Sequence, residues 1–192
     1  IEGCRRIGRG AKGDVYRYDD ELVIKGYNEN NTYHDVEQEI QLARMAFVLG
    51  IPTAISFGIV AVGERYGAMY ELVDSRTLSS TIATHPSHVK AYGLMMAQLA
   101  HTIHGVPVPE GGELPKGTLR AMEYIEEGIG REDKALAGKC RALLEALPEV
   151  DTVLHGDFHS GNVFLPRGEL MLIDMDRLSL GHPIPALLAL IP

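Results

Sequence analysis

The strongest constraint in this chain is the segment His155–Asn162, H-G-D-F-H-S-G-N, which is followed by an apolar run that ends at Asp174. It places one carboxylate, Asp157, in a tight loop, the Asn162 amide at the end of that loop, and a second carboxylate behind a strand-like segment. Phosphoryl transfer needs such a set, because one carboxylate accepts the proton of the attacking hydroxyl and two oxygen ligands hold Mg²⁺ against a triphosphate. The rest of the chain can therefore be searched for residues that would bind the phosphates.

Composition bounds the class of protein. The 192 residues are 45% hydrophobic and 23% charged, which is typical of a globular chain with one domain or two small lobes. No apolar run is long enough for a transmembrane helix. Cys4 and Cys140 have no metal-binding spacing and no signal peptide is evident, so we predict a cytoplasmic protein without a membrane partner. The net charge of −8 argues against nucleic-acid binding, and the oligomeric state stays open.

Residues 5–25 are predicted to be strands around a glycine-rich connection, G-R-G-A-K-G, at Gly8–Gly13. The β-branched and aromatic residues on both sides favour strand–turn–strand over strand–turn–helix. A glycine pattern that opens a helix would instead indicate dinucleotide binding. Taken alone, the pattern leaves a plain glycine hairpin and a phosphate-binding loop equally open.

A helix is predicted after Thr32, which fits a capping box with Asp35. Apolar residues recur on one of its faces at helical spacing, namely Val36, Ile40, Ala43 and Phe47. Two strand-like runs follow at 54–62 and 66–73. The segment therefore predicts an N-terminal β lobe that carries one helix.

Polarity rises abruptly after the second of these runs, so we predict a β-rich, nucleotide-binding lobe at 1–74 and a mostly helical catalytic lobe at 75–192. Helical patterns lie at 88–104, 118–128 and 132–147, and short strands are expected at 153–154, 163–165 and 170–173. Near the end of the first of these helices, His101 and His104 suit the helix dipole when they are protonated. A metal pair is the alternative, but no third ligand is evident.

The order of these features resembles the aminoglycoside phosphotransferase and choline kinase group of the protein-kinase-like fold. The resemblance spans residues from about 5 to 183, and its most specific part is H-G-D-x-x-x-x-N with the following I-D-x-D. It implies an α+β, two-lobed structure with an antiparallel N-terminal β lobe. The residues that carry it are Gly8, Gly10, Gly13, Val15, Lys25, Glu39, Glu71–Val73, His155–Asn162 and Asp174.

The resemblance implies a nucleotide site in the N-terminal lobe. Backbone N–H groups of the loop with Gly8, Gly10 and Gly13 would close over the phosphates of ATP, since glycine allows a close approach. Lys25 would contact the α- and β-phosphates and would be held by a helix carboxylate, for which Glu39 is preferred and Glu37 is the alternative. The backbone of Glu71 and Val73 would bind the adenine edge.

The C-terminal lobe would supply the remaining roles. Asp157 would be the catalytic base, and Asn162 and Asp174 would bind Mg²⁺ through oxygen atoms. His159, near the transferring phosphoryl group, is expected to have a positioning or phosphate-contacting role. Asp176 is either an additional metal contact or a loop cap.

The chain departs from the family pattern near its C-terminus. Gly181–Pro183 is present, but Ala186 stands where the family commonly has an Asp that braces the catalytic loop, and an apolar run, Leu187–Ile191, ends the sequence. We therefore expect a trimmed C-terminus and an incomplete acceptor site. His155 is expected to brace the loop rather than to take part in chemistry.

These features favour an ATP- and Mg²⁺-dependent kinase that phosphorylates a hydroxyl of a small molecule. An acidic segment hints at a cationic acceptor such as an aminoglycoside or an amino alcohol, although a solvated helix face is the simpler interpretation; its residues are Glu110, Glu113, Glu123, Glu126 and Glu127. The alternatives are a nucleotide-binding pseudokinase-like module or fragment, a protein kinase, which the lack of D-F-G and A-P-E opposes, and an NAD(P)-binding protein.

Overall fold

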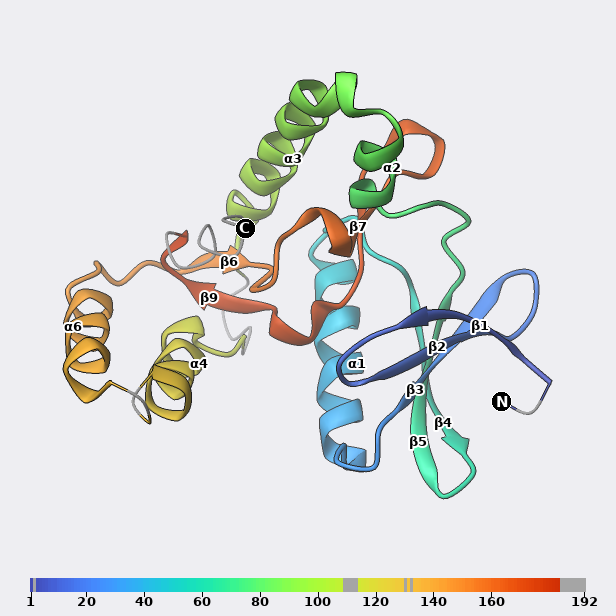
Figure 1. Cartoon of the computed structure of the whole chain (residues 1–192), viewed down its shortest axis with the longest axis horizontal. Helices are drawn as coiled ribbons and strands as arrows, with labels where there is room; N and C mark the ends of the chain where they lie inside the picture. Colours follow the sequence, from blue (N-terminus) through green and yellow to red (C-terminus); the bar gives the residue numbers. More distant parts are fainter. Residues whose placement is uncertain (2, 109–113, 130, 132, 184–192) are drawn as a thin grey trace. The chain divides into compact units, whose positions relative to one another are not determined.

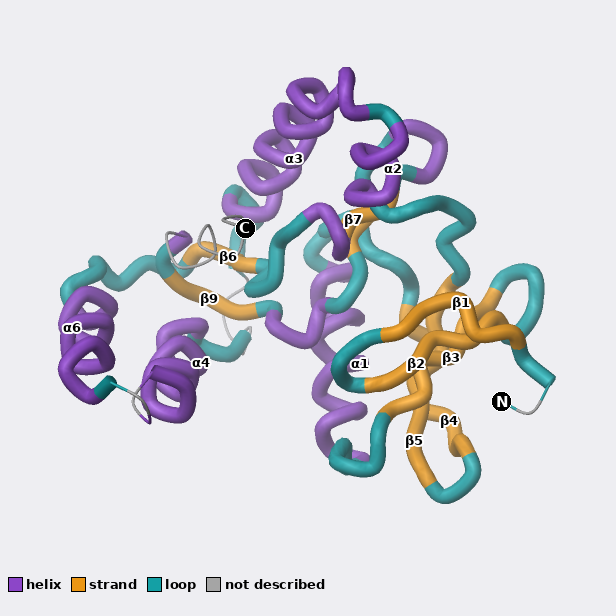
Figure 2. Tube along the Cα trace, viewed as in Figure 1, coloured by secondary structure: helices purple, strands orange, loops and turns teal. Residues whose placement is uncertain are grey.

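The computed structural model describes residues 1, 3–108, 114–129, 131 and 133–183 (Figures 1 and 2). The chain groups into two compact units. The first unit contains Ile1–Met96 and Ser160–Asp176, and the second contains Ala97–His159 and the chain from Arg177 onward. None of the helices in these described stretches is long and apolar enough to cross a membrane.

A five-stranded antiparallel sheet forms the N-terminal part of the first unit. Its spatial order is β1-β2-β3-β5-β4. The strands are β1 (Arg5–Arg9), β2 (Gly13–Arg17), β3 (Leu22–Tyr27), β4 (Ser56–Val62) and β5 (Arg65–Glu71). The glycine-rich segment therefore joins two strands and opens no helix, which confirms the strand–turn–strand prediction.

Helix α1 (Tyr33–Val48) packs against this sheet. Thr32 and Asp35 form the predicted capping box, with each side chain bonded to the other residue's backbone N–H. The shared core consists of Tyr27, Val36, Ile40 and Ala68, with Ile59 and Tyr70 packed beside it. Phe47 was expected on the buried face but is exposed, and the smaller Ala46 is buried instead.

The rest of the first unit contains α2 (Leu78–Thr84), the first half of α3 (Val89–His104), and the strand pair β7 (Val163–Phe164) and β8 (Met171–Leu172). Leu172 ties this pair to the connection between α1 and β4. Its N–H donates to the Pro52 carbonyl at 2.8 Å, and its carbonyl accepts from the Ala54 N–H at 3.4 Å. The segment after the H-G-D loop is thus part of the same unit as the five-stranded sheet.

The second unit contains the remainder of α3, α4 (Gly117–Tyr124), a short π-helical turn (Ile125–Ile129) and α6 (Lys134–Glu145). Its two-stranded sheet pairs β6 (Thr152–Leu154) with β9 (Ser179–Gly181). On α6, Ala137 and Leu144 are buried, whereas Leu136 and Leu143 are exposed. The structure is α+β, as predicted, while the predicted lobe boundary after residue 74 stays a prediction.

Candidate active site

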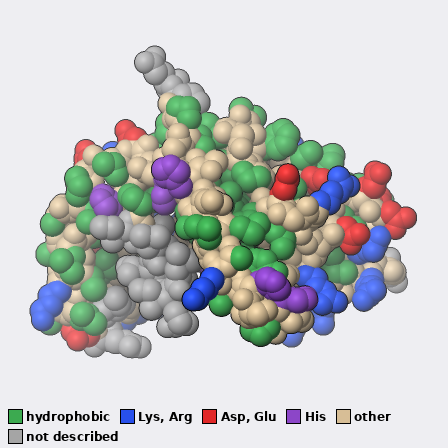
Figure 3. Space-filling model, turned by 90° about the horizontal axis from the view of Figure 1, so that it is seen from above, with side chains coloured by type: hydrophobic (Ala, Val, Ile, Leu, Met, Phe, Trp, Pro, Cys, Tyr) green, Lys and Arg blue, Asp and Glu red, His purple; other side chains and the backbone are tan. Residues whose placement is uncertain are grey.

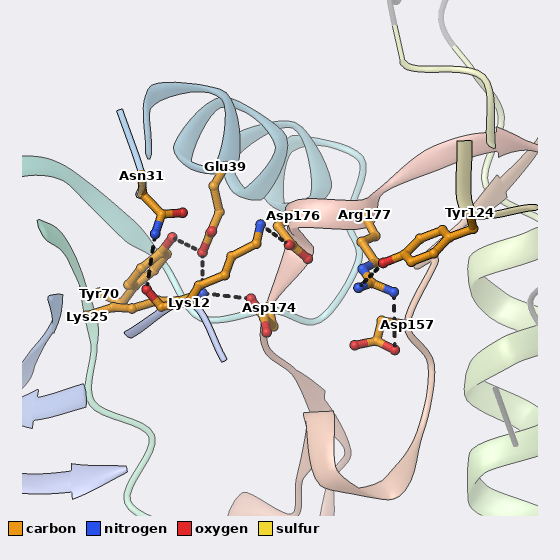
Figure 4. Close-up of polar contacts among 10 residues, drawn as sticks. All are labelled: Lys12, Lys25, Asn31, Glu39, Tyr70, Tyr124, Asp157, Asp174, Asp176 and Arg177. Carbon is orange, nitrogen blue, oxygen red and sulfur yellow. Dashed lines mark hydrogen bonds and ion pairs between the residues drawn. The ribbon is translucent and has the colours of Figure 1, made fainter. Parts of the chain in front are cut away.

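A buried ion-pair network in the first unit centres on Lys25 of β3. Its ammonium nitrogen Nζ lies 2.7 Å from Glu39 Oε1 and 2.8 Å from Asp174 Oδ1 (Figure 4). Glu39 is 4% exposed on α1, and Glu37 is only half-buried. Of the two candidate helix carboxylates, Glu39 is the one that contacts Lys25. The structure therefore joins three of the predicted site residues, which come from β3, α1 and the segment after β8.

The network keeps Lys25 charged. Burial by itself lowers the pKa of the Lys25 ammonium, but the Glu39 and Asp174 carboxylates outweigh burial and raise it above its ordinary value. The Tyr70 hydroxyl donates to Glu39 Oε1 at 3.3 Å. Burial, together with the nearby Glu39 carboxylate, raises the pKa of Tyr70, so this phenol stays a donor. Lys25 therefore presents a fixed positive charge, as a phosphate-binding lysine must.

Oxygen ligands gather beside Lys25. One carboxylate oxygen each from Glu39, Asp174 and Asp176 can be chosen so that all three lie within 4.8 Å of one another. The Ile173 N–H donates to the Asn162 carbonyl at 3.0 Å, which ties Asn162 to the residue before Asp174. Asp174 has a φ of 63°, in the left-handed region that Asp tolerates better than most residues. An all-oxygen set of this kind fits Mg²⁺.

The glycine-rich connection is a tight hairpin turn. The Gly10 N–H donates to the Gly13 carbonyl at 2.8 Å, which leaves Ala11 and Lys12 at the tip. A Cβ on Gly13 would overlap the backbone carbonyl of Gly26 on the neighbouring strand. Gly13 is therefore required by the packing of β2 on β3, independently of any ligand. A Cβ on Gly10 would have its nearest neighbour, the Gly13 carbonyl oxygen, at 3.4 Å.

Gly13→Ala is expected to lower the free energy of unfolding by about 1–3 kcal/mol, because the added methyl group must push two strands apart. Gly10→Ala, the matched change in the same loop, should alter it by less than about 0.5 kcal/mol. Urea denaturation of both variants measures the difference. Equal stabilities would contradict the assignment of Gly13 to sheet packing.

The segment predicted to bind adenine follows β5. The Glu71 N–H donates to the Ile55 carbonyl at 2.9 Å, and the Leu72 N–H donates to the Glu21 carbonyl at 2.7 Å. Within the described part of the chain, the Val73 N–H makes no hydrogen bond. Val73 thus keeps a backbone donor available for a ligand, while the two residues before it are held by the sheet and its loops.

Asp157 lies in the second unit, in the loop that follows β6. Its N–H donates to Nδ1 of the buried His155 at 3.2 Å, which is the bracing contact expected for that histidine. Gly156 has a φ of 81°, and a Cβ there would overlap the Arg177 carbonyl. The loop can therefore pass this point only with glycine.

Two basic side chains lie near the Asp157 carboxylate. His159 Nε2 is 3.7 Å from Oδ2, and Arg177 Nη1 is 4.0 Å from Oδ1. Arg177 also donates from Nη2 to the Tyr124 hydroxyl of α4 at 2.6 Å (Figure 4). Sequence reasoning left Arg177 unassigned and missed Tyr124, because their contact joins segments that are distant in the chain.

A cavity of about 330 Å³ in the second unit reaches Asp157. Its polar lining includes Arg120, Tyr124, Asp157, Arg177 and His182, with apolar surface from Leu144 and Leu154. This size lies at the lower end of the range for small-molecule sites. The cavity therefore brings Asp157 together with a set of hydrogen-bond donors.

The acidic segment that hinted at a cationic acceptor is only partly described. Glu110 and Glu113 lie outside the described residues, as do Ala186 and Leu187–Ile191. Glu123, Glu126 and Glu127 are exposed, and Glu126 pairs with Arg141 at 2.7 Å. On the face drawn in Figure 3, acidic side chains lie beside basic ones, most clearly at its right-hand end. The described acidic residues thus match a solvated helix face.

Comparison with protein families decides the class of this chain. The model of the phosphotransferase enzyme family matches residues 3–184. The chain belongs to this family. No curated protein sequence matches it at a significant level.

Solved structures place this phosphotransferase-family chain in the predicted fold. An aminoglycoside phosphotransferase from Streptomyces rimosus superposes with a TM-score of 0.71 at 18% identity, covering 98% of this chain and 76% of that one. The same enzyme is known in complex with ADP and streptomycin. An aminoglycoside-3'-phosphotransferase of type VIII gives 0.67 at 20% identity, covering 98% and 77%.

A choline/ethanolamine kinase family protein from Mesorhizobium loti gives a TM-score of 0.63 at 14% identity, covering 97% of this chain and 62% of that one. These identities establish the fold and no more. The predicted resemblance to the aminoglycoside phosphotransferase and choline kinase group, and the two-lobed kinase-like fold class, are confirmed.

Proposed function

We propose that this phosphotransferase-family chain moves the γ-phosphoryl group of ATP, in the presence of Mg²⁺, to a hydroxyl group of a small molecule. The observation that carries the proposal is the network of Lys25, Glu39 and Asp174. It holds a permanently charged ammonium beside oxygen ligands, and these are the two components that phosphate binding requires.

Lys25 would bind the α- and β-phosphates. Glu39 would hold it in place, since a long ammonium side chain contributes most when its position is fixed. The glycine hairpin would cover the phosphates with backbone N–H groups, and the unbonded Val73 N–H would meet the adenine edge together with the Glu71 carbonyl. The known complex of the Streptomyces rimosus relative with ADP supports a nucleotide in a fold of this kind.

Asn162 and Asp174 would hold the metal ion, and Asp176 supplies a further carboxylate in the same group. When bound, Mg²⁺ would neutralise phosphate charge during transfer. Within this set, Asp174 also contacts Lys25, so one carboxylate would align both the cation of the protein and the metal.

Asp157 would act on the acceptor. Its carboxylate would accept a hydrogen bond from the acceptor hydroxyl and take the proton late in a direct, in-line transfer. The phosphoryl group would pass from the β–γ bridging oxygen to the acceptor oxygen without a covalent enzyme intermediate. Arg177 and Tyr124 would hold this carboxylate in place, and His159 would position the loop or contact phosphate.

The acceptor class is proposed from the relatives and the cavity. The solved relatives include aminoglycoside phosphotransferases and a choline/ethanolamine kinase family protein, so aminoglycosides and amino alcohols are the first compounds to test. The modest cavity beside Asp157 and Tyr124 favours a compact acceptor or one ring of a larger one.

The direct test is a panel of hydroxyl compounds incubated with the protein, Mg²⁺ and ATP labelled in the γ position. Label should appear in one compound class, and ATP consumption should depend on that compound. ATP that is bound but never consumed with any compound would contradict the proposal and favour a non-catalytic nucleotide-binding module. Binding of NAD(P) without binding of ATP would contradict both.

A further inference from the structure

The tip of the glycine hairpin carries a cation that sequence analysis did not assign. The ammonium of Lys12 forms an ion pair with the Asp176 carboxylate, within the first unit. Figure 4 shows the Lys12 side chain extending to Asp176 beside the Lys25–Asp174 pair. The hairpin tip therefore touches the same acidic group that would bind the metal ion.

The backbone of this tip is fixed separately from its side chain. The Asn28 N–H donates to the Lys12 carbonyl at 2.8 Å, and Asn28 Nδ2 donates to the Ala11 carbonyl at 2.9 Å. Asn31 Nδ2 also donates to the Lys12 carbonyl, at 3.3 Å. These bonds hold the turn against the loop before α1, so Lys12 can change partner without unfolding the hairpin.

The charges of the group are nearly balanced. Three carboxylates, from Glu39, Asp174 and Asp176, face two ammonium groups, from Lys25 and Lys12. Lys25 is 15% exposed and has two carboxylate partners, so it is fixed. Lys12 is 46% exposed and pairs with a carboxylate that is 9% exposed. Of these two ammonium groups, Lys12 is therefore the one that can leave its carboxylate partner.

We propose that Lys12 is a nucleotide-responsive phosphate-binding residue. Without nucleotide it neutralises Asp176; when Mg²⁺ and ATP enter, it passes from Asp176 to the triphosphate and leaves that carboxylate to the incoming metal ion. The inference rests on the proposed function. Its physical basis is exchange, because a divalent cation competes with Lys12 for Asp176 while the triphosphate offers Lys12 a stronger anion.

Two binding affinities of a Lys12 variant distinguish the proposed exchange from a general loss of positive charge. Lys12→Gln should weaken binding of ATP in the presence of Mg²⁺ by about tenfold, the effect of losing one charged hydrogen bond. The same variant should bind Mn²⁺ alone about threefold more tightly, because the competing ammonium is gone. The two affinities therefore change in opposite directions.

The measurements are calorimetric titrations of the whole chain with Mg²⁺–ATP and, separately, with Mn²⁺ without nucleotide. Arg17→Gln is the matched control, since it removes the same charge from the far end of β2, outside the glycine-rich loop, at an ion-paired side chain that is 44% exposed. It should leave both affinities within about twofold of wild type. Lys12→Arg keeps the charge and should bind ATP nearly as wild type does.

An ATP affinity of Lys12→Gln equal to that of Arg17→Gln would overturn the inference, and so would an unchanged affinity for Mn²⁺. Failure of the proposed function would give a different experimental result. If wild type binds ATP but transfers phosphate to no acceptor, the kinase proposal fails, and the opposite shifts in Lys12→Gln would still establish the exchange.

Discussion

Asp157→Asn is expected to lower the rate of phosphoryl transfer by about 10²–10⁴-fold, the usual contribution of a positioned general base. Asparagine keeps the shape of the side chain and can still face His159 and Arg177, but it cannot take the proton of the acceptor hydroxyl. Binding of ATP should stay close to wild type, because the proposed phosphate ligands are other residues. Initial rates at saturating ATP, with a separate binding titration, measure the two effects.

The control for this variant is Asp151→Asn, which removes the same charge from an exposed position just before β6. It should leave the transfer rate unchanged. If Asp157→Asn retained more than about a tenth of the wild-type rate, the base role would have to go to another residue.

Lys25→Met should lose both activity and stability. Removing the charge proposed to bind phosphate is expected to slow transfer by about 10²–10³-fold, as for other fixed electrostatic contacts to a reacting group. The change also leaves the carboxylate of Glu39, which is 4% exposed, without its cation. Breaking a buried ion pair in this way typically lowers the free energy of unfolding by about 3–5 kcal/mol.

The double variant Lys25→Met/Glu39→Gln separates the two losses. Its neutral amide no longer needs a cation, so most of the stability should return while transfer stays slow. Urea denaturation and initial rates of wild type, both single variants and the double variant complete the cycle. A Lys25→Met protein as stable as wild type would mean that the pair does not hold β3 to α1.

Local patterns predicted the elements of the first unit well. The capping box at Thr32 and the strands around the glycine turn depend on neighbouring residues, and both are present as expected. The preference for Glu39 over Glu37 as the partner of Lys25 rested on the family resemblance. In the structure Glu39 makes the contact with Lys25.

The long-range contacts could not be predicted. Strand β9 is three residues of ordinary composition, and only its pairing with β6 makes it a strand. The ion pair of Lys12 with Asp176 and the bond of Arg177 to Tyr124 join distant segments, so no sequence spacing reports them. Phe47 was predicted to be buried but is exposed. Helical spacing predicts which face of a helix is apolar, but it does not predict how much of that face the sheet covers.

The two units are interleaved along the chain, since the first consists of Ile1–Met96 and Ser160–Asp176. Protein synthesis therefore delivers Lys25 and Glu39 long before Asp174 exists. Until Asp174 has been synthesised, Lys25 lacks one of its two carboxylate partners. The proposed phosphate site is therefore completed only with the segment Ser160–Asp176.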